Sequence, residues 1–390
     1  MKNDTKTQEN IDTQKFRSTT VAHPRLMAKI EELMSEINNV EPGDIIFLYG
    51  PTGVGKSTLG KNIKSRLDKE FRKEMGSDPS IIPVLLIEAP HPDGPKFSWK
   101  DHYRRALKTL GEPLISKKQV DLRYSESKWN EQDDRAAGHE LRMVFENALE
   151  YRKVRVLLID EAHHMARGAS TKVSLQGLLD YIKSQANLTK TIIVLIGTYE
   201  LLALRNLSGQ LSRRSTDIHF SRYRFDDADD QQIFFNVVES FFGKMPIPHK
   251  LDLTELNDKF YVNSAGCIGI LSTWLKKALK LAVRNKDPFI AIEHLEKTVL
   301  TLQQLMKITE ELESGESLLK PDGNAEEIIR ARLGLLSPQA KVNKNDSAAS
   351  IESKPKETRP KGRPPRVGKR KPARDKVGRD SIELSGHCNV

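Results

Sequence analysis

The stretch Gly-Pro-Thr-Gly-Val-Gly-Lys-Ser at residues 50–57 decides the fold class of this chain. Five β-favouring residues, Ile45–Tyr49, lead directly into it, and a helical stretch begins at Thr58. Strand, glycine-rich turn and helix start are the context of a phosphate-binding loop, in which backbone N–H groups and the positive end of the helix dipole hold phosphate oxygens. The alternative is a glycine-rich turn with a chance lysine, but every fixed position of the motif is filled.

The residues of this loop predict a site for ATP and Mg²⁺. The Lys56 ammonium supplies charge to the outer phosphates, and the Ser57 hydroxyl is a magnesium ligand. The predicted nucleotide-binding residues are Gly50, Pro51, Thr52, Gly53, Val54, Gly55, Lys56, Ser57 and Thr58.

Composition limits the protein classes that are possible. The chain has 390 residues, of which 37% are hydrophobic and 30% charged, enough for about two domains and a polar tail. No apolar run approaches the roughly 20 residues that span a bilayer, and the first residues carry no signal-peptide pattern. The two cysteines, Cys267 and Cys388, form neither a metal spacing nor a disulfide framework, so we expect a reducing, cytoplasmic location without a membrane partner.

The net charge of +10 is concentrated near the C-terminus. Residues 354–376 hold eleven lysines and arginines and two acidic residues, a net charge of +9. A tail of this kind attracts polyanions.

Hydrophobic patterning predicts a three-layer α/β fold with a parallel sheet. Several candidate strands are continuously apolar, as expected for strands that are buried on both faces, and helical patterns lie between them. The candidate strands are 45–49, 81–87, 154–159, 191–196 and 217–224.

Downstream of residue 225 the strand signal fades and helical patterns follow. We predict helices at 228–243, 252–264, 269–285 and 291–313, and another near 325–335. Beyond residue 337 the chain has too few apolar groups to fold alone. The expected divisions are a flexible N-terminus (1–23), an α/β nucleotide-binding domain (24–225), a helical lid domain (226–305), a helix and linker (306–345) and a disordered basic tail (346–390).

An acid pair follows the third candidate strand. Asp160 is placed to hold Mg²⁺ through water, and Glu161 to polarise the water that attacks the γ-phosphate. The carboxyl end of a central strand lies beside the phosphate loop in open α/β sheets. An acid pair that caps a helix is the alternative. Asp-Glu-Ala-His at 160–163 also occurs in a large helicase superfamily, but the sequence predicts no second motor domain.

Two further positions complete the predicted catalytic set. Thr198 follows the fourth strand and is placed to orient the attacking water, unless it only caps the next helix. Arg213 and Arg214 lie just before the last strand, where they do not easily reach the chain's own phosphates. They are placed to complete the site of a neighbouring subunit, or they are surface arginines.

The order of loop, acid pair, polar sensor, arginine pair and helical lid resembles that of the AAA+ ATPases over residues 24–305. Softer features resemble the transposition regulators TnsC and TniB. These are His23-Pro24-Arg25, the stretch from Tyr103 to Leu114, Glu161-Ala162-His163-His164, and Ile196-Gly197-Thr198-Tyr199-Glu200-Leu201.

The resemblance implies strand order 5-1-4-3-2 and ATP-dependent assembly into a homo-oligomeric ring or helical filament on double-stranded DNA. It further implies a prokaryotic, nucleoid-associated protein that links a TniQ-type target selector to a DDE-type transposase. One departure concerns the second sensor. Residues 269–274 lack the arginine that many relatives carry in the third lid helix, and Lys276, Lys277 or Arg284 are the possible substitutes.

Two regions are candidates for DNA contact. Lys117, Lys118 and Arg123 belong to a basic stretch that faces the central channel in the regulators this chain resembles; otherwise they lie on a solvated loop. Lys361 and Arg363 lie in Pro-Lys-Gly-Arg-Pro, which resembles an AT-hook core for the minor groove, although non-specific phosphate binding by the tail is the broader alternative.

Two other functions remain open. A replication initiator or helicase loader has a similar architecture, although an initiator is expected to carry a winged-helix domain after the lid. A signalling ATPase that binds only proteins is the third class.

Overall fold

The computed structural model describes residues 16, 20–76, 78–92, 94, 97–113, 131–167, 172–206, 215–320 and 324–335. The chain forms two compact units, Met1–Asp322 and Gly323–Val390. The second unit contributes one described helix, α14 (Ala325–Arg332). The predicted basic tail at 346–390 lies outside the described residues. None of the helices among the described residues is both long and apolar enough to cross a membrane.

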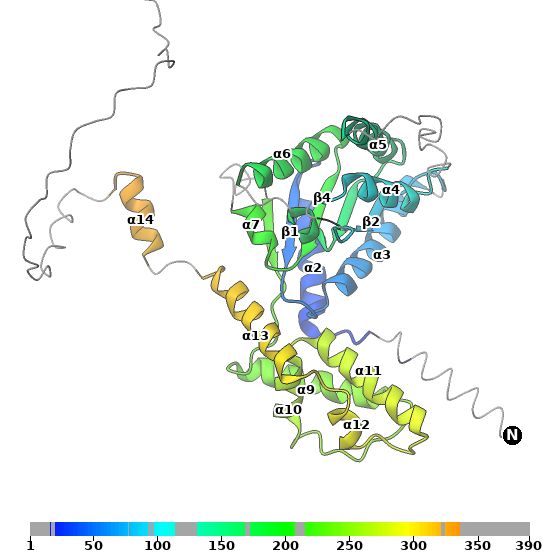
Figure 1. The fold of residues 1–390 in the computed structure, drawn as a ribbon, viewed down its shortest axis with the longest axis vertical. Coiled ribbons are helices and arrows are strands. Elements are labelled where there is room, and N and C mark those ends of the chain that lie inside the picture. Colours follow the sequence, from blue (N-terminus) through cyan, green and yellow to red (C-terminus); the bar gives the residue numbers. More distant parts are fainter. Residues whose placement is uncertain are drawn as a thin grey trace, which may run out of the picture. The chain divides into compact units, whose positions relative to one another are not determined.

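The first unit is built on a five-stranded parallel sheet with the order β2-β3-β4-β1-β5 (Figure 1). This confirms the predicted order 5-1-4-3-2. The strands are β1 (Ile45–Tyr49), β2 (Val84–Glu88), β3 (Val156–Asp160), β4 (Ile192–Gly197) and β5 (Ser215–His219). Tyr49 lies opposite Gly197, and Glu88 opposite Asp160, so the carboxyl ends of four strands meet at one edge.

Alternate residues of the strands β1–β4 enter two separate cores. Phe47 faces one core and Leu48 the other, and both are fully buried. Continuous apolar runs are therefore required because both faces of the sheet are covered. One face packs against α2 (Pro24–Asn39) and α3 (Lys56–Met75). The other packs against α4 (Trp99–Thr109), α5 (Glu131–Tyr151), α6 (Lys172–Thr189) and α7 (Leu201–Arg205).

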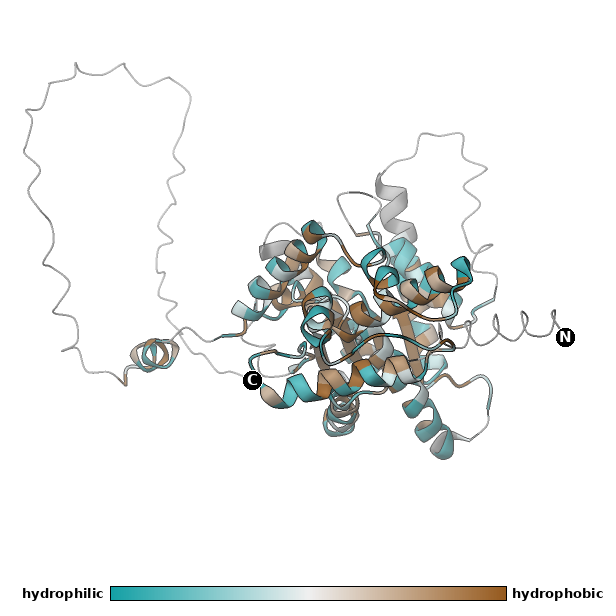
Figure 2. Ribbon diagram, turned by 90° about the horizontal axis from the view of Figure 1, so that it is seen from below, coloured by the Kyte–Doolittle hydropathy of each residue, from teal (hydrophilic) through white to brown (hydrophobic). Residues whose placement is uncertain are grey.

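A helical region with its own core follows the sheet. Its helices are α9 (Ala228–Gly243), α10 (Asn257–Ser264), α11 (Ile268–Asn285) and α12 (Ile292–Glu296). Helix α13 (Leu302–Ser317) then runs back toward α7, as Figure 1 shows. In Figure 2 the helices alternate between brown and teal, which is typical of helices with one buried and one solvated side.

The helix predicted at 291–313 is in fact two helices, α12 and α13. Thr301 ends the break between them, because its hydroxyl accepts a hydrogen bond from the Gln304 N–H at 3.3 Å. The Gln304 side chain in turn accepts from the Thr301 N–H at 3.0 Å. This capping box was a readable signal that the sequence analysis missed.

Several other boundaries differ from prediction, and three of the differences have a clear cause. β2 begins at Val84 because Pro83 has no N–H for the ladder. β5 ends at His219, after which Phe220 donates the last hydrogen bond to the Tyr49 carbonyl at 2.8 Å. α10 begins at Asn257, because the Asp252 carboxylate caps a separate turn before it.

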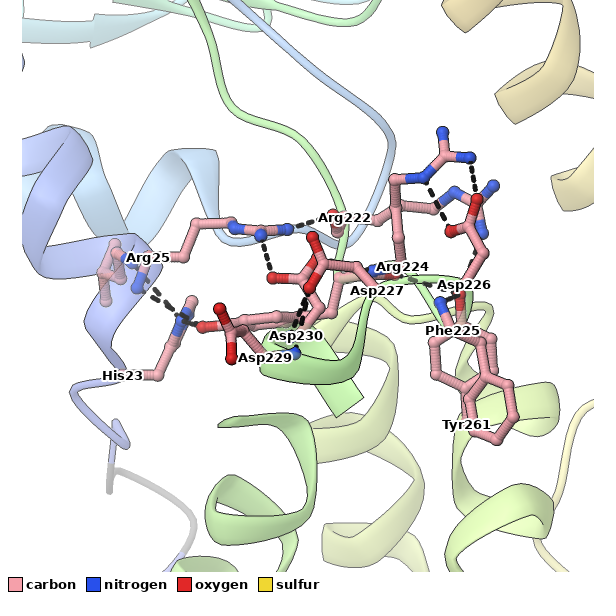
Figure 3. Close-up of polar contacts among 12 residues, drawn as sticks. His23, Arg25, Arg222, Arg224, Phe225, Asp226, Asp227, Asp229, Asp230 and Tyr261 are labelled. Carbon is pink, nitrogen blue, oxygen red and sulfur yellow. Dashed lines mark hydrogen bonds and ion pairs between the residues drawn. The ribbon is translucent and has the colours of Figure 1, made fainter. Parts of the chain in front are cut away.

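Polar contacts connect the start of α2 to the segment between β5 and α9 and to the first turn of α9 (Figure 3); this contact region is called the hinge below. Arg25 forms an ion pair with Asp230 and lies 4.3 Å from the centroid of the Tyr223 ring. His23 Nδ1 accepts a hydrogen bond from the Tyr223 hydroxyl at 2.8 Å. Burial, with the nearby Arg25 charge, lowers the pKa of His23 to about 4, so the imidazole is a neutral acceptor. The Arg224 N–H donates to the second oxygen of Asp230 at 2.8 Å.

Candidate nucleotide site

The phosphate loop leaves the end of β1 at a position that only glycine can occupy. A Cβ atom on Gly50 would lie 2.1 Å from the Phe220 carbonyl oxygen. Gly53 and Gly55 have φ angles of +79° and +119°, a region that side chains disfavour. The loop therefore turns tightly into α3, whose first N–H groups have no acceptor within the helix. Those N–H groups are available to an anion.

Lys56 is buried at the start of α3, with 6% of its surface exposed. Its ammonium donates hydrogen bonds to the Gly50 carbonyl at 3.0 Å and the Pro51 carbonyl at 2.8 Å. Burial lowers the pKa of Lys56 to about 8, while the charges of Glu161 and Asp160 oppose that shift. The site therefore holds a buried cation close to two carboxylates.

The acid pair lies where β3 ends, at the same edge as the loop. Glu161 has a left-handed backbone conformation, with φ +53°, and its N–H donates to Asp160 Oδ1 at 2.9 Å. A non-glycine residue in this region is uncommon and clusters at functional sites. Burial, followed by the Asp160 charge, raises the pKa of Glu161, which makes its carboxylate a stronger base.

Two histidines follow the acid pair in a short 3₁₀ helix, η2 (Ala162–Ala166). His163 Nδ1 lies 3.4 Å from Glu161 Oε2, but it is buried and makes no hydrogen bond among the described residues. Burial, with the charges of His164 and Arg167, lowers the pKa of His163 to about 3, so its imidazole does not neutralise Glu161. His164 Nδ1 donates to the Ala89 carbonyl at 3.1 Å. Neither role was predicted from the sequence.

Thr198 follows β4, next in the sheet to both β1 and β3. Its hydroxyl oxygen is buried and has no hydrogen-bond partner within the described part of the chain. Buried hydroxyls are usually paired, because an unpaired one costs about 1–3 kcal/mol. An unpaired hydroxyl at this edge is able to form a hydrogen bond with a ligand or with a bound water.

The helical region contacts the phosphate loop directly. The Gly269 N–H, in the first turn of α11, donates to the Gly53 carbonyl at 2.7 Å. A Cβ atom on Gly269 would lie 2.5 Å from that oxygen, so this approach requires glycine. Cys267, just before α11, is fully buried, and burial raises the pKa of its thiol to about 12. Residues 269–274, where relatives carry the second sensor, therefore contact the phosphate loop through the backbone of Gly269. Lys276 lies two helical turns beyond Gly269, about 10 Å along the helix axis.

The donor set fits Mg²⁺. Hydroxyl and carboxylate oxygens are the ligands this ion prefers, and Ser57 and Asp160 supply one of each beside the loop. A second group, Glu161, His163 and His164, brings one ligand atom from each residue within 4.8 Å of the others. Because imidazole nitrogens suit transition metals better than magnesium, the first pair is the better match.

Seven predicted site residues lie outside the described part of the chain. They are Arg213, Arg214, Lys117, Lys118, Arg123, Lys361 and Arg363. Ser215, which directly follows the arginine pair, lies opposite Ile45 at the amino edge of the sheet.

Comparison with known proteins identifies the domain type. Residues 40–204 match the AAA domain family. With the parallel order 2-3-4-1-5, this establishes the AAA+ form of the P-loop fold. No curated protein matches the chain.

Solved structures are similar only distantly. The Aeropyrum pernix ORC2 protein has 13% identity and a TM-score of 0.47, with 74% of this chain and 72% of that chain covered. The A. pernix ORC1 protein in complex with DNA has 16% identity and a TM-score of 0.47, with 85% and 75% covered. Domain III of the Thermotoga maritima replication initiation protein DnaA has 14% identity and a TM-score of 0.40, with 75% and 96% covered. At TM-scores below 0.5 these likenesses do not bear on function.

Proposed function

We propose that the AAA domain of this chain binds and hydrolyses ATP with Mg²⁺. The observation that carries the proposal is the meeting of three polar groups at one edge of the sheet. The three groups lie on adjacent elements: the buried Lys56 ammonium, the Glu161 carboxylate of raised pKa, and the Thr198 hydroxyl, which has no hydrogen-bond partner among the described residues. A triphosphate would contact Lys56, and an attacking water would contact Glu161 and Thr198.

Each residue has a separate task in this mechanism. Lys56 and the free N–H groups of α3 bind the phosphates and offset charge that builds up on them. Glu161 accepts the proton of the attacking water, and Thr198 holds that water in line. Mg²⁺, held by Ser57 and Asp160, would neutralise phosphate charge.

We further propose that Arg213 or Arg214 completes the site of a neighbouring subunit. Ser215 begins β5 at the amino edge, so five residues of strand, about 16 Å, separate it from the edge that holds the chain's own loop. The guanidinium of one subunit would then stabilise the transition state in the nucleotide site of its neighbour. Replacing both arginines should then reduce turnover and nucleotide-dependent self-association together.

The decisive experiment replaces Glu161 with glutamine. Glu161→Gln removes the base but keeps the shape, so ATP binding should persist while turnover falls by about 10²–10⁴-fold. The matched control is Glu150→Gln on α5, an exposed carboxylate away from the site. A Glu161→Gln protein that still turns over ATP at the normal rate would refute the assigned role.

For the cellular role, we propose an ATP-switched, DNA-binding regulator of transposition that assembles on duplex DNA and links a TniQ-type selector to a DDE-type transposase. The motif resemblance and the basic segment at 354–376 support it. A replication initiator or helicase loader is the second candidate. The AAA domain match fits either role, and none of the comparisons above names a transposition protein.

Assembly on DNA tests both roles, and the partner separates them. Glu161→Gln protein with ATP, Mg²⁺ and duplex DNA should form rings or filaments visible by electron microscopy. Adding a DDE-type transposase should then direct insertion beside the assembly if the first role is right. Loading of a replicative helicase without any effect on insertion would favour the second. A protein that stays monomeric and shows no DNA affinity with ATP contradicts both.

A further inference from the structure

Helix α13 lies against the turn that carries Thr198. Near its end, the backbone of Gly315 is so close to the Tyr199 ring that a Cβ atom would lie 2.0 Å from Tyr199 Cδ2. Glycine inside a helix is about 1 kcal/mol less favourable than alanine. Position 315 therefore has a packing reason for glycine, and that reason is Tyr199.

An ion pair holds α13 in this place. Arg222, in the hinge, donates from Nε to Glu316 Oε1 at 2.8 Å and from Nη2 to Glu316 Oε2 at 3.4 Å. Both side chains are about one-fifth exposed, so solvent screens the pair only in part. Leu312 is buried, and Leu319, just beyond the helix, packs on the core between the sheet and α4–α7. α13 is thus attached both to the hinge and to the α/β layers.

Tyr199 connects this helix to the nucleotide edge. Its ring centroid lies 6.4 Å from that of Tyr49, the residue before the phosphate loop. Its hydroxyl forms a hydrogen bond with His219 Nε2 at 2.9 Å, at the end of β5. The hydroxyl of Thr198, the preceding residue, has no hydrogen-bond partner in the part of the chain that the structure describes. A shift of Tyr199 would therefore move Thr198 relative to the loop.

We propose that Gly315 and Glu316 are positioning residues for ATP hydrolysis, which act through Tyr199 on the Thr198 hydroxyl. A helix that follows the helical region thereby sets the geometry of the hydrolytic water. This inference rests on the proposed ATPase function. Misplacement of a positioned group by about 1 Å can cost 10²-fold in rate, whereas phosphate binding by Lys56 and the loop does not involve this contact.

Gly315→Ala tests the contact. The added methyl must displace either the ring or the helix, so turnover at saturating ATP should fall by about tenfold, the loss expected when the Thr198 hydroxyl itself is removed. The dissociation constant for a fluorescent ATP analogue should stay within about twofold of the parent value, because the loop is untouched. The control is Gly177→Ala on α6, the same change in a helix where a Cβ atom meets nothing within 4 Å.

A double-mutant cycle tests the route through Thr198. If Gly315 acts only by placing that hydroxyl, Gly315→Ala combined with Thr198→Val should be no slower than Thr198→Val alone. Additive losses would overturn the proposed route. So would a Gly315→Ala variant that weakens binding and turnover equally, because that marks a general structural defect.

Glu316→Gln keeps the inference testable if Gly315→Ala does not fold. Turnover should fall while binding is kept, and the exchanged pair Arg222→Glu with Glu316→Arg should recover part of the rate. The activity of the parent protein distinguishes a failure of this inference from a failure of the proposed function. A parent that hydrolyses no ATP refutes the proposed function, whereas an active parent matched by an equally active Glu316→Gln refutes only this inference.

Discussion

Two regions of the molecule treat their polar groups in opposite ways. At the carboxyl edge of the sheet, Thr198 Oγ1 and His163 Nδ1 are buried without hydrogen-bond partners among the described residues, and Glu161 has a left-handed backbone. At the hinge, Arg25 and Arg222 are each paired with a carboxylate, and both oxygens of Asp230 are occupied. The first arrangement suits a region that receives a ligand. The second suits a region that attaches the helical part of the chain to the α/β part.

The largest expected effect is at the ligand-receiving edge. Lys56→Ala removes the buried cation, so nucleotide binding should be severely weakened and turnover should fall by about two to three orders of magnitude. The measurement is ATP binding and phosphate release. Lys61→Ala, an exposed lysine on the same helix, is the control and should behave as the parent. Normal turnover by the Lys56 variant would end the assignment of this edge as the site.

A second variant at this edge separates activity from stability. Thr198→Val keeps the shape but replaces an unpaired hydroxyl, so turnover should fall about tenfold while the thermal midpoint stays equal or rises. Thr191→Val is the matched control, because the Thr191 hydroxyl donates to the Val154 carbonyl at 3.0 Å. There we expect a loss of about 1 kcal/mol in unfolding free energy and no change in turnover. If the two variants behave alike, the contrast between functional and structural hydroxyls is wrong.

The hinge should show the reverse pattern. Asp230→Ala leaves Arg25 without its partner, so the free energy of unfolding should fall by about 1–3 kcal/mol. Turnover per folded molecule should change much less than in the edge variants. Chemical denaturation measures the first quantity, and the exposed neighbour Asp229→Ala is the control. A variant as stable as the parent would show that the hinge contacts do not contribute to the free energy of unfolding.

The smallest effect is a proton balance at Lys56. In the free protein its pKa is lowered to about 8, and a bound triphosphate would raise it by adding negative charge. Binding should therefore take up a fraction of a proton above about pH 8 but none near pH 6, and affinity should weaken as pH rises through that window. Calorimetry in two buffers of different ionisation enthalpy measures the uptake. The same enthalpy in both buffers at about pH 9 would contradict it.

Local signals in the sequence were enough to predict the sheet and the tight turn between β1 and α3. Continuous apolar runs marked the buried strands, and Gly53, Gly55 and Lys56 identified the turn, because each of these features depends on neighbours close in the chain. The prediction of one helix at 291–313 was wrong, because the capping box that starts a new helix at Thr301 was not recognised.

Other features depend on contacts between distant residues, which no local pattern encodes. Nothing near Gly315 indicates Tyr199, 116 positions away, and nothing near Gly53 indicates that Gly269 donates to it. The unpaired state of Thr198 Oγ1 is likewise a property of the folded surroundings. Sequence reasoning could name Thr198 but could not show that its hydroxyl is free.

The buried thiol of Cys267 has a practical consequence for watching this molecule in motion. Alkylating reagents attack the thiolate, which a pKa of about 12 makes scarce and complete burial makes inaccessible. Labelling of Cys267 therefore requires a local opening of the structure around the start of α11. In a Cys388→Ser background, the labelling rate measures how often this region opens. A nucleotide that stabilises the contact between α11 and the phosphate loop should lower that rate.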